Sequence, residues 1–267
     1  YELDEEKEER VRRQLSKDYV VITSNKRLER IAEDFVAHYT KRWQTGKAMI
    51  VCIDKITTVR LYNKIEKYWH SEIERCKQMI EQAAGEQEEI DFENYLEWLE
   101  ETQRLVVVSE DQNEVKTFQR WDLDIEPHRK IIKDPKRNLE EEFKEDDHPF
   151  RVAIVCAMWL TGFDVESLAT MYIDKPMKMH TLMQTIARAN RVHEGKHNGL
   201  IVDYNGMVKS LRKALAIYAV GRPQEGDTPE SGDEQDPVPL EDSLLDEYKE
   251  ALQACVDHLA YLGYDLS

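Results

Sequence analysis

The chain alternates short runs of consecutive apolar residues with longer stretches in which apolar residues recur at helical spacing. The apolar runs of strand length lie at residues 48–53, 105–108, 152–157, 168–173 and 200–202. The helical patterns lie at residues 26–43, 59–69, 70–84, 92–101 and 181–189. Strands that are apolar throughout and separated by helices are typical of a parallel sheet with helices on both faces. We therefore predict an α/β fold.

One internal region departs from this alternation. Residues 111–147 are polar and are interrupted by Pro127 and Pro135. The region ends in a predicted charged helix through Leu139 and Phe143.

Composition divides the chain into four segments. Residues 1–17 are charged and are predicted to form a linker helix, whereas residues 18–221 hold the alternating strands and helices. Residues 222–240 are rich in Pro, Gly and acidic residues, which is typical of a flexible linker. Residues 241–267 contain an amphipathic helix. We expect one α/β domain at 18–221 and a C-terminal helical extension.

The formal net charge of -17 argues at first against a nucleic-acid partner, because phosphate binding requires Lys and Arg on the contacting surface. The charge is unevenly distributed, however. Acidic residues concentrate at 2–9, 86–93 and 225–247, whereas residues 180–213 carry six Lys and Arg against two acidic residues. A binding groove samples only part of a surface, so the net charge does not exclude nucleic acid.

Neither a membrane span nor a metal site is indicated. No apolar run reaches the roughly 18 residues that a membrane helix needs, and no export signal opens the chain, so we expect a cytoplasmic location. The four cysteines show no zinc-ligand spacing. Cys52 and Cys156 lie within apolar runs, where we expect buried thiols.

The tetrapeptide Thr161-Gly162-Phe163-Asp164 closely follows the apolar run 152–157. In open parallel sheets, ligands bind beyond the carboxyl ends of the strands. A hydroxyl, a glycine that permits close backbone approach and a carboxylate could together contact a phosphate and a ribose. An ordinary turn has the same composition, so the tetrapeptide alone leaves both interpretations open.

Gln184, Arg188 and Arg191 share one side of a predicted helix, since they are spaced four and three residues apart. Two arginines on a rigid element can stabilise the transition state of phosphoryl transfer, because their guanidinium groups match phosphate oxygens. A solvated basic helix surface has the same pattern, so this alternative also stays open.

Asp174 and Lys175 stand at the end of the apolar run 168–173, and Pro176 stiffens the exit from the strand. The two charged residues either form a local ion pair or contact a partner domain. We favour a structural role.

The order of these motifs is more specific than any one of them. A strand, Thr161–Asp164, a second strand and then a helix bearing Gln184, Arg188 and Arg191 resemble motifs V and VI of superfamily-2 helicases. The strings that resemble the motor subunit of type I restriction enzymes, within that superfamily, lie at residues 158–164, 172–176, 180–192 and 199–204. The resemblance implies a RecA-like parallel sheet, the second of two motor domains.

The resemblance also implies roles in a nucleotide site. Arg188 and Arg191 match the arginines that approach the nucleotide phosphates from the second domain, and we predict them as catalytic residues. Gly162, Asp164 and Gln184 match positions beside the nucleotide.

Three residues are predicted to contact DNA. Thr161 matches a position that can touch the nucleic-acid backbone in this family. Lys55 and Ser109 end strands on the edge where the fold meets nucleic acid. Residues in such positions also serve as helix caps or lie exposed to solvent, so the assignment of Lys55 and Ser109 is a hypothesis.

The implied nucleotide site is incomplete. The chain contains no Gly-x-x-x-x-Gly-Lys-Ser/Thr sequence and no magnesium-binding Asp-Glu-x-His motif. We expect ATP and Mg²⁺ to act in the full-length enzyme, and expect neither to be bound by this chain alone. The chain by itself is therefore predicted to be inactive, and we find no convincing nuclease motif in it.

The resemblance also implies the partners of the chain. They are duplex DNA, the first RecA-like domain of the same polypeptide, and the modification and specificity subunits of the restriction complex. In this interpretation, ATP hydrolysis drives translocation of duplex DNA before cleavage. Two alternatives stay open: another superfamily-2 motor, such as a type III restriction subunit or a remodeller, and a non-catalytic docking module whose acidic surface binds a basic partner.

Overall fold

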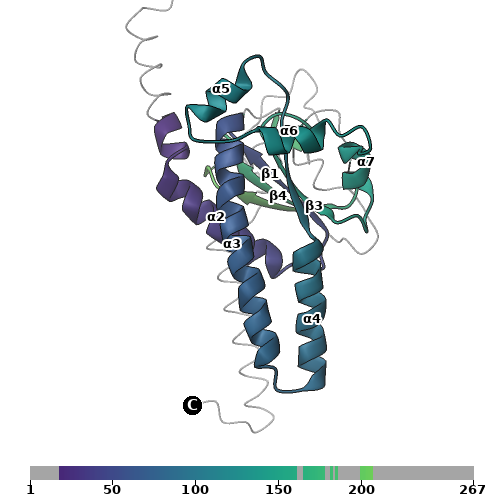
Figure 1. Ribbon diagram of the computed structural model, residues 1–267. Coiled ribbons are helices and arrows are strands. Elements are labelled where there is room, and N and C mark those ends of the chain that lie inside the picture. Colours follow the sequence, from purple (N-terminus) through teal and green to yellow (C-terminus); the bar gives the residue numbers. More distant parts are fainter. Residues whose placement is uncertain (1–17, 161–164, 178–180, 183, 186–198, 207–267) are drawn as a thin grey trace, which may run out of the picture. The chain divides into compact units, whose positions relative to one another are not determined.

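The computed structural model of the chain describes residues 18–160, 165–177, 181–182, 184–185 and 199–206. The helices drawn in Figure 1 include α2 (Asn25–Thr40), α3 (Lys55–Glu81), α4 (Glu86–Glu101), α5 (Glu114–Gln119), α6 (Glu126–Ile132) and α7 (Leu139–Lys144). The strands are β1 (Lys47–Cys52), β2 (Gln103–Val107), β3 (Phe150–Val155), β4 (Leu168–Asp174) and β5 (Leu200–Asp203). Each strand overlaps one of the predicted apolar runs.

The five strands form one parallel sheet in the order β2-β3-β1-β4-β5. At its centre, Ile50 of β1 aligns with Ile154 of β3 on one side and with Tyr172 of β4 on the other. Every residue of β1 and β4 is buried. Burial on both sides of a strand explains why these runs are apolar throughout instead of alternating. The predicted α/β fold with a parallel sheet is confirmed.

Helices α2 and α3 pack side by side across one face of the sheet (Figure 1). Phe35 and Tyr39 of α2 and Trp69 of α3 are fully buried there. The indole Nε1 of Trp69 donates to the carbonyl oxygen of Leu99 at 3.0 Å. This bond satisfies a buried donor, which is costly to leave unpaired, and ties α3 to the end of α4.

Helices α3 and α4 form a helical hairpin that continues beyond the sheet (Figure 1). The predicted helices at 59–69 and 70–84 are one continuous α3 of 27 residues, because no Gly or Pro interrupts it. Helix α4 begins at Glu86, directly after Gly85, and not at residue 92. Acidic residues in its first turn favour this earlier start, because they interact with the positive end of the helix dipole.

The polar region 111–147 is more ordered than its sequence suggests. It contains the predicted helix α7 and also α5 and α6, which periodicity does not reveal. Pro127 does not break α6, because it lies in the first turn, where no intrahelical N–H bond is lost. Asn138 caps α7, and its side chain accepts from Glu141 N.

The thiols of Cys52, Cys76 and Cys156 are free and buried, as predicted for Cys52 and Cys156. The predicted segments 1–17, 222–240 and 241–267 lie outside the described residues, so their boundaries stay predictions. Within the described ranges, no helix combines the length and apolar character that crossing a bilayer requires.

Candidate functional site

The connections that follow β1, β2, β3 and β4 surround one hollow of about 660 Å³ at the carboxyl edge of the sheet. The lining residues are Ile53, Asp54, Lys55, Ile56, Asp111, Gln112, Glu114, Thr117, Phe118, Cys156, Ala157 and Lys175. In open parallel sheets this edge is where ligands bind. The hollow is therefore the candidate site.

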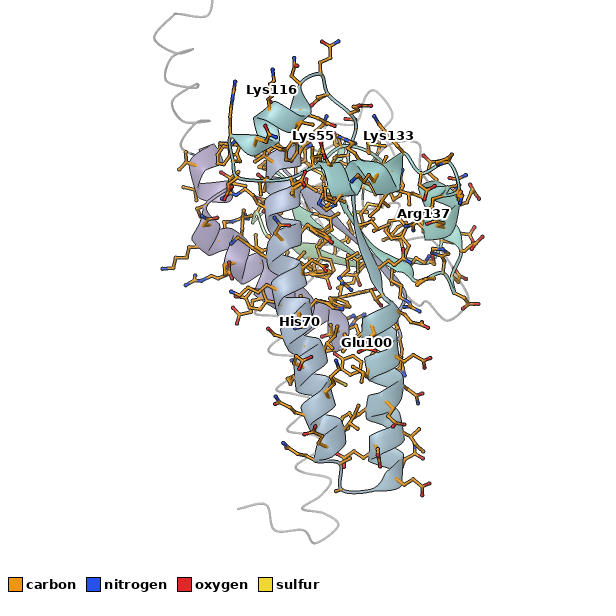
Figure 2. The ribbon with its side chains drawn as sticks, in the orientation of Figure 1. Lys55, His70, Glu100, Lys116, Lys133 and Arg137 are labelled. Atoms are coloured by element: carbon orange, nitrogen blue, oxygen red, sulfur yellow. The ribbon has the colours of Figure 1, made fainter. Side chains whose placement is uncertain are left out.

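Lys55 is the first residue of α3 and lies at the end of that helix nearest α5 and α6, far from His70 (Figure 2). Asp54 fixes the preceding turn: one carboxylate oxygen accepts from Thr57 N at 2.7 Å, and the other accepts from the Tyr19 hydroxyl at 2.6 Å. Burial and this hydrogen bond raise the pKa of Tyr19 to about 12, so its hydroxyl remains a donor at neutral pH. The start of α3 is thereby held in place.

Arg129 of α6 fixes the connection that follows β2. Its guanidinium donates to both carboxylate oxygens of Glu114, at 2.6 and 2.7 Å, and to the carbonyl oxygens of Val108 and Ser109. The Arg129 and Glu114 side chains are only 10% and 8% exposed. Hydrogen bonding to the guanidinium holds the pKa of Glu114 below its usual range. This bidentate pair, completed by two carbonyl acceptors, makes the strand end rigid.

Asp111 links this rigid connection to the start of α3. Its backbone N donates to Glu114 Oε2 at 3.2 Å, and its Oδ2 lies 2.6 Å from Lys55 Nζ. The side chain of Lys55 is 18% exposed, whereas that of Asp111 is 62% exposed. One ion pair therefore joins the ends of β1 and β2 at the hollow.

Lys175 brings a second amine to the hollow. Its Nζ donates to the carbonyl oxygen of Cys156 at 2.6 Å. The predicted alternative of a local ion pair between Asp174 and Lys175 is wrong, because Asp174 pairs with Arg27 of α2 at 2.6 Å. Adjacent residues at a strand end point to opposite sides, which separates these two side chains.

Arg27 ties the start of α2 to the ends of β4 and β5. Its guanidinium contacts Asp174 Oδ1 and donates to the carbonyl oxygen of Tyr204 at 2.7 Å. Asp174 is fully buried, and this burial raises the pKa of its carboxyl against the opposing effect of Arg27. Because Asp174 does not line the hollow, this cluster supports the sheet.

Two amines and three carboxylates line the hollow. Lys55 and Lys175 offer two amines, which can serve as phosphate donors. Burial raises the pKa of the Cys156 thiol, so Cys156 does not supply a thiolate at neutral pH. In the part of the chain that the structure describes, no cluster of His, Cys, Asp and Glu could hold a metal ion.

The structure locates only some of the predicted site residues. Those that lie outside the described residues are Thr161, Gly162, Asp164, Arg188 and Arg191. Lys55 lines the hollow, but it begins α3 and does not end a strand as predicted, because β1 stops at Cys52 and Asp54 caps the helix. Ser109 is exposed and contributes its carbonyl to Arg129, and Gln184 is exposed. The roles assigned to all of these residues stay predictions.

Sequence reasoning missed two contributors to this edge. Arg129 gave no signal, because its partner Glu114 is 15 residues away in a region without visible periodicity. Lys175 did give a signal, since it directly follows the strand β4. The sequence favours a structural role for Lys175, and the strand order that brings it to the hollow is not visible there.

The fold and the hollow together define an α/β domain with a parallel sheet and a hollow at the carboxyl edge of its strands. Residues 44–206 match the family model described as Type I restriction enzyme subunit R domain 3. Because this match covers more than half of the chain, the chain belongs to that family, as its motifs predicted.

Similar proteins carry matching names. The type I restriction enzyme HindI endonuclease subunit of Haemophilus influenzae is 36% identical over 206 residues, which are 74% of this chain and 16% of that protein. The MjaIXP endonuclease subunit of Methanocaldococcus jannaschii is 33% identical over 218 residues, which are 81% of this chain and 17% of that protein. The chain therefore spans about one sixth of the length of these relatives.

A solved structure is also similar. It is a fragment described as an HsdR subunit of a type I restriction enzyme from Vibrio vulnificus YJ016, with a TM-score of 0.45 and 13% identity. The alignment covers 72% of this chain and 29% of that chain.

Proposed function

We propose that the chain is the second motor domain of a type I restriction R subunit, and that it supplies two arginines for ATP hydrolysis. The observation that carries the proposal is the order of Thr161–Asp164 and Gln184–Arg191 within the residues that match domain 3 of subunit R. Membership of this family favours motor motifs over a solvated helix surface, the alternative that spacing alone leaves open.

The two arginines act on phosphate oxygens in this proposal. When the motor domains close, Arg188 and Arg191 place their guanidinium groups on the nucleotide phosphates, with Gly162, Asp164 and Gln184 beside the nucleotide. Their charge offsets the negative charge on the equatorial oxygens in the transition state, which can contribute roughly 10³ to 10⁵ in rate. ATP and Mg²⁺, when bound, supply the transferred phosphoryl group and its counter-charge.

The first motor domain is the proposed main holder of ATP and Mg²⁺. This follows from the sequence, which contains no phosphate-binding lysine motif of the Gly-x-x-x-x-Gly-Lys-Ser/Thr type. The fragment alone is expected to hydrolyse no ATP. Measurable hydrolysis by the isolated chain that disappears in Arg191→Ala would contradict this division of labour.

The carboxyl edge of the sheet is the proposed contact with duplex DNA. Lys55 and Lys175 present amines to the hollow, and Ser109 follows β2. Thr161 lies outside the described residues and is assigned to the contact from its motif alone. Each motor domain would hold the DNA backbone in turn as the pair closes and opens, which moves the duplex before cleavage. The modification and specificity subunits complete the proposed complex, and the specificity subunit recognises the DNA site.

Arg191→Ala in the complete R subunit, assembled with its partner subunits, tests the proposal. DNA-stimulated ATP hydrolysis should fall by roughly 10³-fold or more, while DNA affinity stays near the wild-type value. Arg212→Ala is the matched control, because it removes an arginine outside the motif. Full ATP hydrolysis by Arg191→Ala would refute the motor assignment and favour a helicase-like docking module.

A further inference from the structure

The ion pair between Lys55 and Asp111 occupies the same amine that the proposed function assigns to DNA. We propose that Asp111 is a displaceable counter-ion: it holds Lys55 while DNA is absent, and a backbone phosphate of duplex DNA takes its place. Asp111 thereby sets the affinity of this edge for DNA. The inference rests on the proposed function, since it requires Lys55 to contact DNA.

The two partners differ in how firmly they are held. Lys55 is the first residue of α3, its side chain is 18% exposed, and the turn before it is fixed by the Asp54 cap. Asp111 lies in the connection between β2 and α5, and its side chain is 62% exposed. When the pair opens, the carboxylate can rotate into solvent while the amine stays at the hollow.

The backbone beneath Asp111 is nevertheless fixed. Glu114 accepts from Asp111 N at 3.2 Å, and Arg129 holds Glu114 together with the carbonyl oxygens of Val108 and Ser109. The carboxylate therefore returns to the same place when phosphate leaves. A rigid backbone under an exposed, rotatable side chain is what a reversible counter-ion requires.

The second amine of the hollow provides a contrast. Lys175 donates to the carbonyl oxygen of Cys156, which is a neutral acceptor, so its positive charge is not cancelled by this partner. The carboxylate of Asp54, which also lines the hollow, is already engaged by Thr57 N and the Tyr19 hydroxyl. A phosphate that approaches the hollow therefore meets one amine with a neutral acceptor and one that is directly paired with a carboxylate.

Displacement of Asp111 by phosphate is energetically accessible. An ion pair with one exposed partner is weak, because water and salt screen it. A DNA phosphate arrives with the favourable release of condensed counterions and can contact more than one amine. The exchange replaces one charged acceptor by another, so Lys55 is never left without a partner.

DNA binding by the complete R subunit tests the proposal, with a short labelled duplex as the probe and fluorescence anisotropy as the readout. Asp111→Asn should bind DNA roughly three- to tenfold more tightly at low salt, because it removes a competing acceptor and a negative charge beside the phosphate. The gain should shrink as salt rises. If Asp111 only tethers its loop, affinity will stay unchanged or fall, which overturns the proposal.

Glu110→Gln is the matched control. It removes the same charge one residue away, from an exposed pair with Lys133, which does not line the hollow and is labelled in Figure 2. Its effect on DNA affinity should be clearly smaller than that of Asp111→Asn. Equal gains in the two variants would mean a general charge effect and would overturn the counter-ion role.

Lys55→Met separates failure of this inference from failure of the proposed DNA contact. Lys55→Met should weaken binding, and adding Asp111→Asn to it should produce little further gain. If Lys55→Met weakens DNA binding but Asp111→Asn does not strengthen it, Lys55 contacts DNA and Asp111 is not its displaceable counter-ion. If Lys55→Met leaves DNA affinity unchanged, Lys55 does not contact DNA. If Asp111→Asn still raises DNA affinity in the Lys55→Met background, Asp111 does not act as the counter-ion of Lys55.

Discussion

Ion pairs lie near both ends of helix α3, but these pairs are built differently. At the end that begins with Lys55, the neighbouring Arg129–Glu114 pair is bidentate, about nine-tenths buried and completed by two carbonyl acceptors. Near the other end, Lys77 contacts Glu74 and Glu100 at 3.4 and 3.5 Å, with side chains about half exposed.

The comparison separates charges that fix a structure from charges that keep a surface solvated. A buried pair leaves an uncompensated charge when one partner is removed, whereas water replaces the partner in an exposed pair. The hairpin is rich in acidic residues, and the pairs of Lys77 there are open to solvent, although Lys77 and Glu100 line a hollow of their own. The strand-end edge carries fewer charges, and these hold backbone atoms in place around a hollow. The two sets of pairs therefore differ in what they hold in place.

Arg129→Met should have the largest effect on stability. It leaves the Glu114 carboxylate buried without its cation and two carbonyl oxygens without their donor, which should cost about 3–5 kcal/mol of unfolding free energy. Urea unfolding followed by circular dichroism measures the loss. Replacing both partners, as Arg129→Met with Glu114→Leu, should recover a large part of it, because no buried charge remains. A loss below about 1 kcal/mol would mean that this buried pair stabilises the fold no more than an exposed pair does.

The second variant, Lys47→Met, tests a buried cation that has no carboxylate partner. Lys47 is 1% exposed at the start of β1, and its Nζ donates to the carbonyl oxygens of Glu142 and Glu145. Burial lowers the pKa of Lys47 to about 8. The unfolded chain therefore binds more protons here than the folded chain between about pH 8 and pH 10, and folded stability from this group rises with pH.

The measurement is the difference in unfolding free energy between the wild type and Lys47→Met. Between pH 8 and pH 10, the wild type should gain roughly 2 kcal/mol of unfolding free energy relative to Lys47→Met. The difference is needed because the raised pKa values of the buried cysteine thiols act in the opposite direction in both proteins. A difference that stays constant over this range would mean that the Lys47 pKa is close to that of an exposed lysine.

The same contrast explains what the sequence could reveal. The strands were predictable because burial on both sides makes each one a continuous apolar run, and Lys55 was found because it stands two residues after such a run. The strand order was not predictable, since parallel pairing leaves no local signal. Lys175 was therefore not connected with Lys55, although both line one hollow.

Long-range polar contacts were also invisible. The Arg129–Glu114 pair joins two short helices in a region that reads as a polar connection, and Asp174 pairs with Arg27, 147 residues earlier, instead of with its neighbour. Each pair depends on tertiary placement, which hydrophobic periodicity does not encode. Arg188 and Arg191 were predicted from the order of the motifs in the sequence, but they lie outside the described residues.

Lys77→Met should have the smallest effect and completes the comparison. Its side chain is 46% exposed, and its partners Glu74 and Glu100 are each 52% exposed, so water can replace every contact that it makes. The change in unfolding free energy should be the smallest of the three variants and should vanish at high salt, because mobile ions screen exposed pairs. The long apolar stem of methionine preserves packing along α3, which isolates the effect of the charge. A salt-independent loss as large as that of Arg129→Met would show that the hairpin pairs fix structure too, and the distinction between the two ends of α3 would fail.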